Sequence, residues 1–241
     1  MMKKALVTGA NKGIGFEIAK QLGNNGYFVL VGARNVQRGK AAVERLLASG
    51  LAADQVELLP LDIANATSRK QARDVIQAKH ADLSLLVNNA GAAGDMKPAL
   101  ETSAAEIQSL LDVNLFGTFE FTKLMVPILE ANNGRIADIT GPFEAALQFS
   151  PAAYSISKVA LNASILNLAA NFENKKMALE IFGIFPGGVT TDLNDNRKSS
   201  FMKSAEQAGK EITALLLDKE KHNGEILTTN KKVIGQLQRL N

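Results

Sequence analysis

Short apolar runs recur along the chain, and each is followed by a longer segment in which apolar positions repeat with helical spacing. Because the runs are nearly continuous rather than alternating, they predict strands of a parallel sheet that is covered on both faces. The predicted strands are residues 5–8, 28–33, 56–60, 83–88, 135–140, 179–185 and 225–228.

The segments between these runs predict helices. In the first, Ile14, Ile18 and Leu22 share one helical face, and Asn24-Asn25-Gly26 provides a C-terminal stop. The other predicted helices are residues 36–49, 67–79, 103–131, 152–174 and 204–217. This alternation predicts an α/β fold: one Rossmann-like domain over residues 1–241, with a doubly wound parallel sheet of about seven strands and helices on both faces. The longest irregular segments, residues 141–151 and 186–203, are expected at the carboxyl ends of strands, where ligands bind.

The overall composition narrows the class of protein. With 46% hydrophobic and 21% charged residues, the chain is typical of a soluble globular protein. The net charge is only +3, and basic residues are interleaved with acidic ones, so we expect no nucleic-acid partner. No run approaches the roughly 20 apolar residues that cross a bilayer, and the apolar run at residues 5–7 is too short for an export signal. We therefore expect no membrane partner.

Cysteine and histidine usage indicates no metal site. The chain has no cysteine, which excludes disulfides and thiolate ligands and is compatible with a cytoplasmic location. His80 and His222 lie far apart in the sequence, and we expect both at the surface near helix ends, without a carboxylate at metal-ligand spacing.

A glycine-rich turn, Thr8-Gly9-Ala10-Asn11-Lys12-Gly13-Ile14-Gly15, joins the first strand to the first helix. Glycines let the backbone approach a pyrophosphate closely, and the helix N-terminus offers unpaired N–H groups and a positive dipole end to the anion. Glycine also marks any strand-to-helix turn, so the cluster alone leaves ordinary turn geometry as an alternative. Its place at the first turn favours a dinucleotide.

The end of the second predicted strand bears on which dinucleotide binds. An NAD site usually places an acidic residue there, against the ribose 2′-hydroxyl, but this chain has Arg34. Arg34 and Lys12 supply two cations for a 2′-phosphate, which favours NADP(H). The alternative is that both are solvated surface cations.

Two further motifs, Asn88-Asn89-Ala90-Gly91 and Tyr154-Ser155-Ile156-Ser157-Lys158, follow the glycine turn in order. Together the three motifs resemble the short-chain dehydrogenase/reductase family. The similarity runs nearly end to end and includes Asp62-Ile63, Asn114 and the segment Pro186-Gly187-Gly188-Val189-Thr190-Thr191. The resemblance implies an oxidoreductase of the NADPH-dependent carbonyl-reductase type that acts on a small carbonyl or alcohol.

The spacing of Tyr154 and Lys158 agrees with that chemistry. Residues four apart share a helix face, so a phenol and an ammonium can converge on one substrate oxygen. A nearby cation stabilises the phenolate, and we expect it to lower the pKa of Tyr154 from about 10 towards neutrality. A chance pair on an amphipathic helix is the alternative.

The resemblance also implies roles for single residues. Lys158 holds the nicotinamide ribose, and Asn114 positions a water in a proton relay. The implied catalytic residues are Tyr154, Lys158, Asn114 and Thr140. The implied cofactor-binding residues are Gly9, Asn11, Lys12, Gly13, Ile14, Gly15, Arg34, Asn35, Asp62, Ile63, Asn89, Ala90, Gly91, Tyr154, Lys158, Pro186, Gly187, Val189 and Thr191. For several of these, turn formation or satisfaction of buried backbone groups is the alternative.

One position departs from the family pattern. Counting back from Tyr154, Gly141 occupies the place of a serine that donates a hydrogen bond to the reacting oxygen. Losing one donor at a developing oxyanion costs roughly a hundredfold to a thousandfold in rate. Thr140, Ser150 or a loop backbone N–H are the candidate replacements.

Three functional hypotheses follow from the sequence. The first is an NADPH-dependent carbonyl reductase in which residues 192–203 cover the substrate. The second, motivated by Gly141, is a catalytically silent NADP(H)-binding sensor or partner subunit. The third is a lyase or isomerase on the same fold. By resemblance, the long fourth and fifth helices pair with a second subunit in a homodimer or homotetramer, although monomeric reductases also occur in the family.

Overall fold

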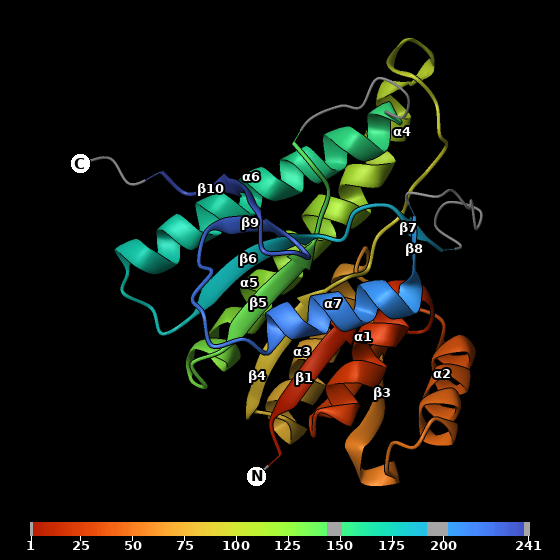
Figure 1. The fold of residues 1–241 in the computed structure, drawn as a ribbon, viewed down its shortest axis with the longest axis vertical. Coiled ribbons are helices and arrows are strands. Elements are labelled where there is room, and N and C mark those ends of the chain that lie inside the picture. The colour runs from red at the N-terminus through yellow and green to blue at the C-terminus, as the bar shows by residue number, and fades with distance from the viewer. Residues whose placement is uncertain (1, 144–150, 192–201, 239–241) are drawn as a thin grey trace.

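A central sheet organises the computed structural model, which describes residues 2–143, 151–191 and 202–238 (Figure 1). The strand order is β10-β9-β6-β5-β4-β1-β2-β3, and all neighbours pair in parallel except β10 with β9. The strands of this sheet are β1 (Lys4–Thr8), β2 (Phe28–Ala33), β3 (Val56–Pro60), β4 (Leu83–Asn88), β5 (Arg135–Ile139), β6 (Glu180–Phe185), β9 (Glu225–Thr228) and β10 (Val233–Gln236). A separate pair is formed by β7 (Val189–Thr190) and β8 (Lys203–Ser204).

Helices cover both faces of the sheet (Figure 1). One face packs against α1 (Gly13–Asn24), α2 (Val36–Ala48) and α7 (Ala205–Leu216), and the other against α3 (Ala66–Lys79), α5 (Thr118–Glu130) and α6 (Ala152–Asn174). Because strand side chains alternate, Val7 enters the first core and Leu6 the second, and both are fully buried. The expected doubly wound α/β class is therefore confirmed.

The connection after β3 returns the chain across the sheet to β4, which lies on the other side of β1. Successive crossovers therefore leave β1 in opposite directions, and the loops at the carboxyl ends of β1 and β4 diverge. A crevice at such a switch point is the usual ligand site of this architecture.

Several sequence-based assignments needed correction, since the short strands β7 and β8, for example, were not expected. The helix expected at residues 103–131 is interrupted: α4 (Ala104–Leu111) passes into a π-helical turn, η3 (Asp112–Gly117), before α5 begins. Strand β10 was not expected, because its segment is short, partly exposed and lacks a continuous apolar run. Short 3-10 turns, η1 (Ala53–Gln55) and η2 (Ala99–Glu101), complete the described elements.

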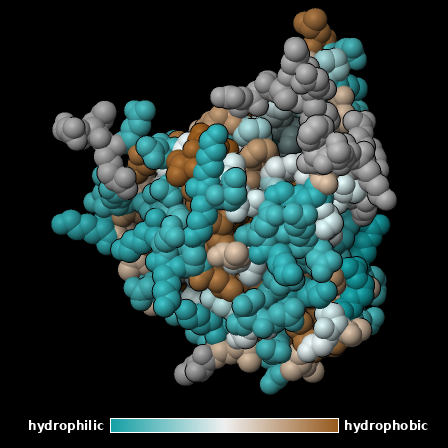
Figure 2. Space-filling view, in the orientation of Figure 1, coloured by the Kyte–Doolittle hydropathy of each residue, from teal (hydrophilic) through white to brown (hydrophobic). Residues whose placement is uncertain are grey.

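Both histidines are buried, so their expected surface positions were wrong. His80 is 5% exposed at the end of α3, with its ring stacked on Phe28, and His222 is 4% exposed against Phe182. A neutral imidazole ring can pack against other aromatic rings in the core. The sequence pattern alone did not reveal that the two histidines pack in this way. Hydrophilic residues cover most of the face shown in Figure 2, and no helix of the described residues is long and apolar enough to span a bilayer.

Candidate active site

The glycine turn after β1 adopts the backbone conformation that its sequence requires. Gly9 and Gly13 have φ values of 64° and 58°, in the region that favours glycine. A Cβ at Gly9 would lie 2.9 Å from the Cα of Ala90, and a Cβ at Gly15 would overlap the side-chain amide of Asn89. The turn therefore packs directly on the segment that follows β4, and larger residues are excluded at both positions.

Helix α1 begins at this turn without a side-chain cap. Lys12 at the N-cap position makes no capping hydrogen bond, and the first turn contains no acidic residue. In α2, α3, α4 and α7, by contrast, an Asn or Ser side chain accepts a hydrogen bond from the first turn. The N-terminus of α1 thus keeps the donor groups and partial positive charge that bind a pyrophosphate.

Thr8 and Asn89 lock the glycine turn to the end of β4. The Thr8 hydroxyl accepts hydrogen bonds from the backbone N–H groups of Asn89 and Ala90 at 3.0 and 2.9 Å. The Asn89 side-chain amide donates back to the carbonyl of Thr8 at 2.9 Å. Sequence reasoning did not single out Thr8, although its position at the start of the turn was the available signal.

The rim expected to hold the adenosine half lies at the carboxyl ends of β2 and β3. Arg34 is exposed, and its guanidinium makes no hydrogen bond or ion pair within the described ranges. Asn35 uses its side chain to cap α2, because its Oδ1 accepts a hydrogen bond from the N–H of Arg38 at 2.9 Å. Asp62 accepts one from the N–H of Ala64, while Ile63 is buried. Arg34 is therefore the polar group here with an uncommitted side chain.

The Lys158 side chain lies close to two glycines of the crevice, Gly91 and Gly141. A Cβ at Gly91 would lie 3.8 Å from its Nζ, and a Cβ at Gly141 would lie 3.0 Å from its Cβ. The ammonium is buried, donates to the carbonyl of Ile139 at 2.8 Å, and lies 5.8 Å from the ring centroid of Tyr154. The structure thus brings together Gly91, Tyr154 and Lys158 as the sequence predicted.

The electrostatics of this pair differ from the sequence-based expectation. Burial raises the pKa of Tyr154 to about 12, and no charged group of the described residues offsets it. Burial also lowers the pKa of Lys158 to about 8, although Asp138 acts in the opposite direction. The expected lowering of the Tyr154 pKa was wrong for this structure, because burial of the phenol raises its pKa.

Asn114 lies in the π-helical turn η3, and its side chain is fully committed. Its amide donates to the carbonyl of Ala92 and to the hydroxyl of Ser157 at 2.8 and 2.9 Å, while its Oδ1 accepts from the N–H of Ala92 at 2.8 Å. The Ser157 hydroxyl in turn donates to the carbonyl of Tyr154. Asn114 therefore holds the loop after β4 against the first turns of α6, and it does so from a π turn, a feature that is frequent at functional sites.

The geometry around Gly141 bears on which group could donate a hydrogen bond in place of the missing serine. The Thr140 hydroxyl donates to the Oδ1 of Asn162 at 2.6 Å, so its proton is used inside the core and the structure does not favour Thr140 as the donor. Asn162 also donates to the carbonyl of Gly141 at 2.9 Å. Ser150 lies outside the described residues, and Pro142 has no N–H to offer.

The segment after β6 closes the crevice over the glycine turn. Gly187 has a φ of 78°, Val189 is buried, and a Cβ at Gly13 would lie 3.7 Å from the Cγ2 of Thr191. Pro186 and Gly187 also border an open cavity of about 470 Å³. Its other lining residues are Phe185, Lys203, Glu211, Thr228, Thr229 and Asn230. The cover expected from residues 192–203 lies almost entirely outside the described residues.

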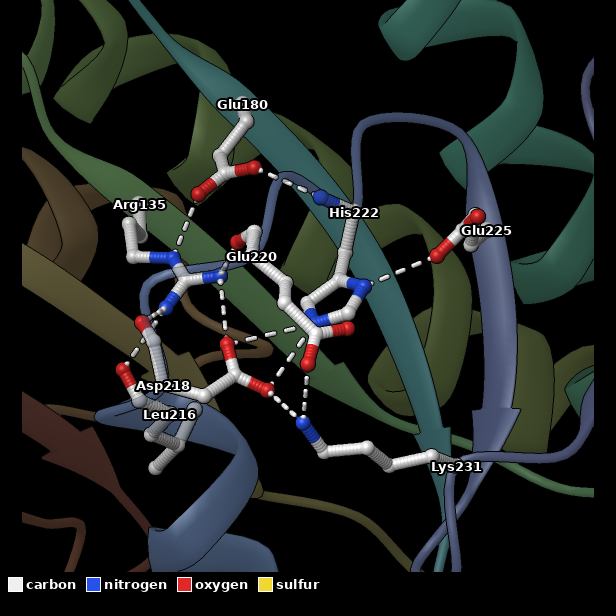
Figure 3. A network of polar contacts seen from close by, with 8 residues as sticks. All are labelled: Arg135, Glu180, Leu216, Asp218, Glu220, His222, Glu225 and Lys231. Carbon is white, nitrogen blue, oxygen red and sulfur yellow. Dashed lines mark hydrogen bonds and ion pairs between the residues drawn. The ribbon is translucent and has the colours of Figure 1, made fainter.

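A second polar cluster lies at the other end of the sheet, where β5 and β6 begin (Figure 3). Arg135 donates to the carbonyls of Leu216, Asp218 and Glu220 at 2.9 to 3.0 Å and forms an ion pair with Glu180. The guanidinium thereby caps the C-terminus of α7 and ties it to two strands.

The same cluster corrects the expectation about carboxylates near histidine. Asp218, Glu220 and His222 place one ligand atom each within 4.8 Å of one another. However, the Lys231 ammonium binds Asp218 and Glu220 at 2.9 and 2.7 Å, as Figure 3 shows. Because Lys231 and Arg135 already form ion pairs with these carboxylates, the arrangement fits a structural clamp.

Comparison with known proteins identifies the family. A family model described as short chain dehydrogenase matches residues 3–201, and the chain belongs to that family. Dehydrogenase/reductase SDR family member 4 of Caenorhabditis elegans is 32% identical over 213 residues, which cover 88% of this chain and 78% of the relative. Carbonyl reductase [NADPH] 1 of Mus musculus is 36% identical over 139 residues, 56% of this chain and 48% of the relative.

A solved structure extends the likeness over the whole chain. Alcohol dehydrogenase from the archaeon Thermococcus sibiricus, complexed with 5-hydroxy-NADP, superposes with a TM-score of 0.80 at 26% identity and covers 100% of both chains. The expected membership of the short-chain dehydrogenase/reductase family, a family of oxidoreductases, is therefore confirmed.

Proposed function

We propose that this protein is an NADP(H)-dependent reductase of small carbonyl compounds. The observation that carries the proposal is the convergence of an uncapped helix N-terminus, a close-packed glycine turn and the Tyr154–Lys158 pair on one crevice. When bound, NADPH supplies the hydride. The relatives named for NADPH or NADP, together with these residues, support that cofactor.

The residues present fit a dinucleotide phosphate. Gly9 and Gly15 let the turn pack closely on the segment after β4, because a Cβ at either position would meet Ala90 or Asn89, and the first turn of α1 keeps N–H groups for the pyrophosphate. Arg34, with Lys12 beside the turn, pairs with the 2′-phosphate. Thr191, whose side chain lies against Gly13, and the nearby Val189 contact the nicotinamide end.

Tyr154 is the general acid in this proposal. Its raised pKa keeps the phenol protonated across neutral pH, so that it can donate its proton to the carbonyl oxygen as negative charge develops there. This protonation state suits reduction better than oxidation, because oxidation needs the phenolate as base. Lys158 holds the ribose and stabilises the phenolate left behind, and Asn114, with its side chain committed, orients a water through its main chain.

The oxyanion support is reduced relative to the family pattern, since Gly141 has no hydroxyl. This feature favours a second candidate function, an NADP(H)-binding protein without turnover that acts as a sensor or partner subunit. The two candidates differ in whether cofactor binding leads to NADPH consumption.

The experiment is NADPH oxidation against a panel of aldehydes, ketones and quinones, with wild type and Tyr154→Phe compared at matched cofactor occupancy. Cofactor fluorescence measures that occupancy separately. The reductase proposal expects turnover in wild type and loss of at least about a hundredfold in the variant, with unchanged NADPH binding. Binding without turnover in either protein supports the silent alternative, while product without net NADPH consumption supports a lyase or isomerase.

We also propose assembly into a homodimer or homotetramer through the face formed by η3 and α6. Phe116, Ile156 and Val159 are large apolar side chains exposed by 47%, 44% and 37% on these two elements, which pack against each other. Light scattering of wild type and Ile156→Glu checks this, because a charge in an apolar interface disrupts it. An unchanged monomeric mass in both proteins would contradict the assembly.

A further inference from the structure

Asp138 is a buried acid next to the strand residue that binds the Lys158 ammonium. It is 2% exposed on β5, where it pairs in register with Asn88 of β4. Strand alternation places it on the same face as Ile136 and Thr140, and therefore toward α5 and α6. Lys158, on α6, donates its hydrogen bond to Ile139, the next residue along the strand.

The partners of the Asp138 carboxylate are few. The side-chain amide of Asn88 donates to its Oδ1 at 2.7 Å and also donates to the Thr122 hydroxyl at 2.9 Å. A neutral amide does not compensate a buried charge, so an ionised carboxylate here needs a cation. Among the described residues, Lys158 is the charge that acts on Asp138, and Asp138 is the charge that acts on Lys158.

We propose that Asp138 is a positioning residue whose buried carboxylate is the counter-charge of Lys158, keeps that lysine protonated, and thereby sets the alkaline limit of the reaction. The part of this proposal that concerns the pH range of the reaction rests on the reductase function proposed above. The pairing of the Asp138 and Lys158 charges does not depend on that function. Tyr154, Asn114 and Thr122, the polar groups nearby, are neutral at physiological pH and do not replace the carboxylate.

The direction of the pH effect follows from the two groups. Burial raises the pKa of Asp138 to about 6, against the Asn88 hydrogen bond and the Lys158 charge, and burial lowers the pKa of Lys158 to about 8. Both groups are therefore charged between those two values. Below the lower value Asp138 gains a proton, and above the upper value Lys158 loses its own.

Asp138→Asn tests the pairing because it removes the charge while leaving an oxygen that accepts the Asn88 hydrogen bond. In protein labelled with ¹⁵N-lysine, the Nζ signal of Lys158, assigned by its absence in Lys158→Arg, reports the lysine titration. We expect its midpoint to move to lower pH by about one pH unit in Asp138→Asn. Asp112→Asn, at an exposed acid, is the control and leaves the midpoint unchanged.

Wild-type protein gives a second measurement that needs no substitution. The Lys158 signal should shift once near its own titration and again at the lower pH at which Asp138 becomes neutral. Absence of that second shift, together with an unchanged midpoint in Asp138→Asn, would overturn the proposal. If the variant does not fold, the wild-type titration alone decides.

The pH dependence of kcat connects the pair to catalysis. The alkaline limb of NADPH-dependent reduction should move to lower pH in Asp138→Asn by the same amount as the lysine midpoint. A shifted lysine midpoint with an unmoved limb would overturn the catalytic part. Absence of turnover in every protein would instead refute the proposed reductase function and leave the titration result standing.

Discussion

Restoring a hydroxyl at Gly141 is the sharpest perturbation of the proposed oxyanion site. A Cβ there would lie 3.0 and 3.2 Å from Cβ and Cγ of Lys158, atoms near the backbone of α6 that have little freedom to move. Any larger residue therefore pays a packing penalty of about 1–3 kcal/mol. Gly141→Ser and Gly141→Ala share this penalty, so the ratio of their activities isolates the contribution of the hydroxyl.

We expect Gly141→Ser to turn over about a hundredfold to a thousandfold faster than Gly141→Ala, because one donor at a developing oxyanion has that effect. The assay is the initial rate of NADPH oxidation at saturating carbonyl substrate, with unfolding in urea measured in parallel to confirm equal destabilisation. Equal turnover in the two variants would refute the reasoning, since it would show that position 141 does not face the reacting oxygen.

Three further predictions concern binding and stability. Arg34→Ala should weaken NADPH about tenfold to a hundredfold and leave NADH unchanged in a fluorescence titration; equal loss for both cofactors would show that Arg34 does not read the 2′-phosphate. Gly15→Ala should weaken both cofactors at least about tenfold, because its Cβ overlaps Asn89 and opens the lock on the glycine turn; unchanged affinity would contradict the close packing. Arg135→Met should lower the free energy of unfolding by about 3 kcal/mol, since three carbonyls and Glu180 lose their partner; denaturation in urea measures this, and an unchanged midpoint would exclude the clamp.

Much of the fold was predictable because the parallel strands are buried on both faces. Val7 and Leu6, side by side in β1, each fill a separate core, so the run reads as continuously apolar. Strand β10 gave no such signal, since its residues are partly exposed at the sheet edge.

The proximity of Tyr154 and Lys158 and the glycine turn were predictable because local spacing fixes them. Tyr154 and Lys158 share a helix face by periodicity alone, and Gly13 needs its positive φ for the turn. The π turn at Asn114 was not predictable, because its helical pattern continues on both sides.

Contacts between distant segments were beyond sequence reasoning. The role of Asn162, which holds Thr140 and Gly141 from the middle of α6, depends on the packing of that helix on β5. The pKa of Tyr154 likewise depends on burial of the phenol, which local spacing does not reveal. The charges of Asp138 and Lys158 act on each other only because strand β5 and helix α6 pack together in the fold.

Transfer of deuterium from NADPH labelled at C4 of the nicotinamide tests the central claim most directly. Mass spectrometry of the alcohol formed from a reactive carbonyl substrate, with both labelled epimers of NADPH used in turn, follows the hydride. The account predicts one deuterium on the carbinol carbon per NADPH consumed, from one epimer only. Product without deuterium from either epimer would contradict a hydride transfer in this crevice.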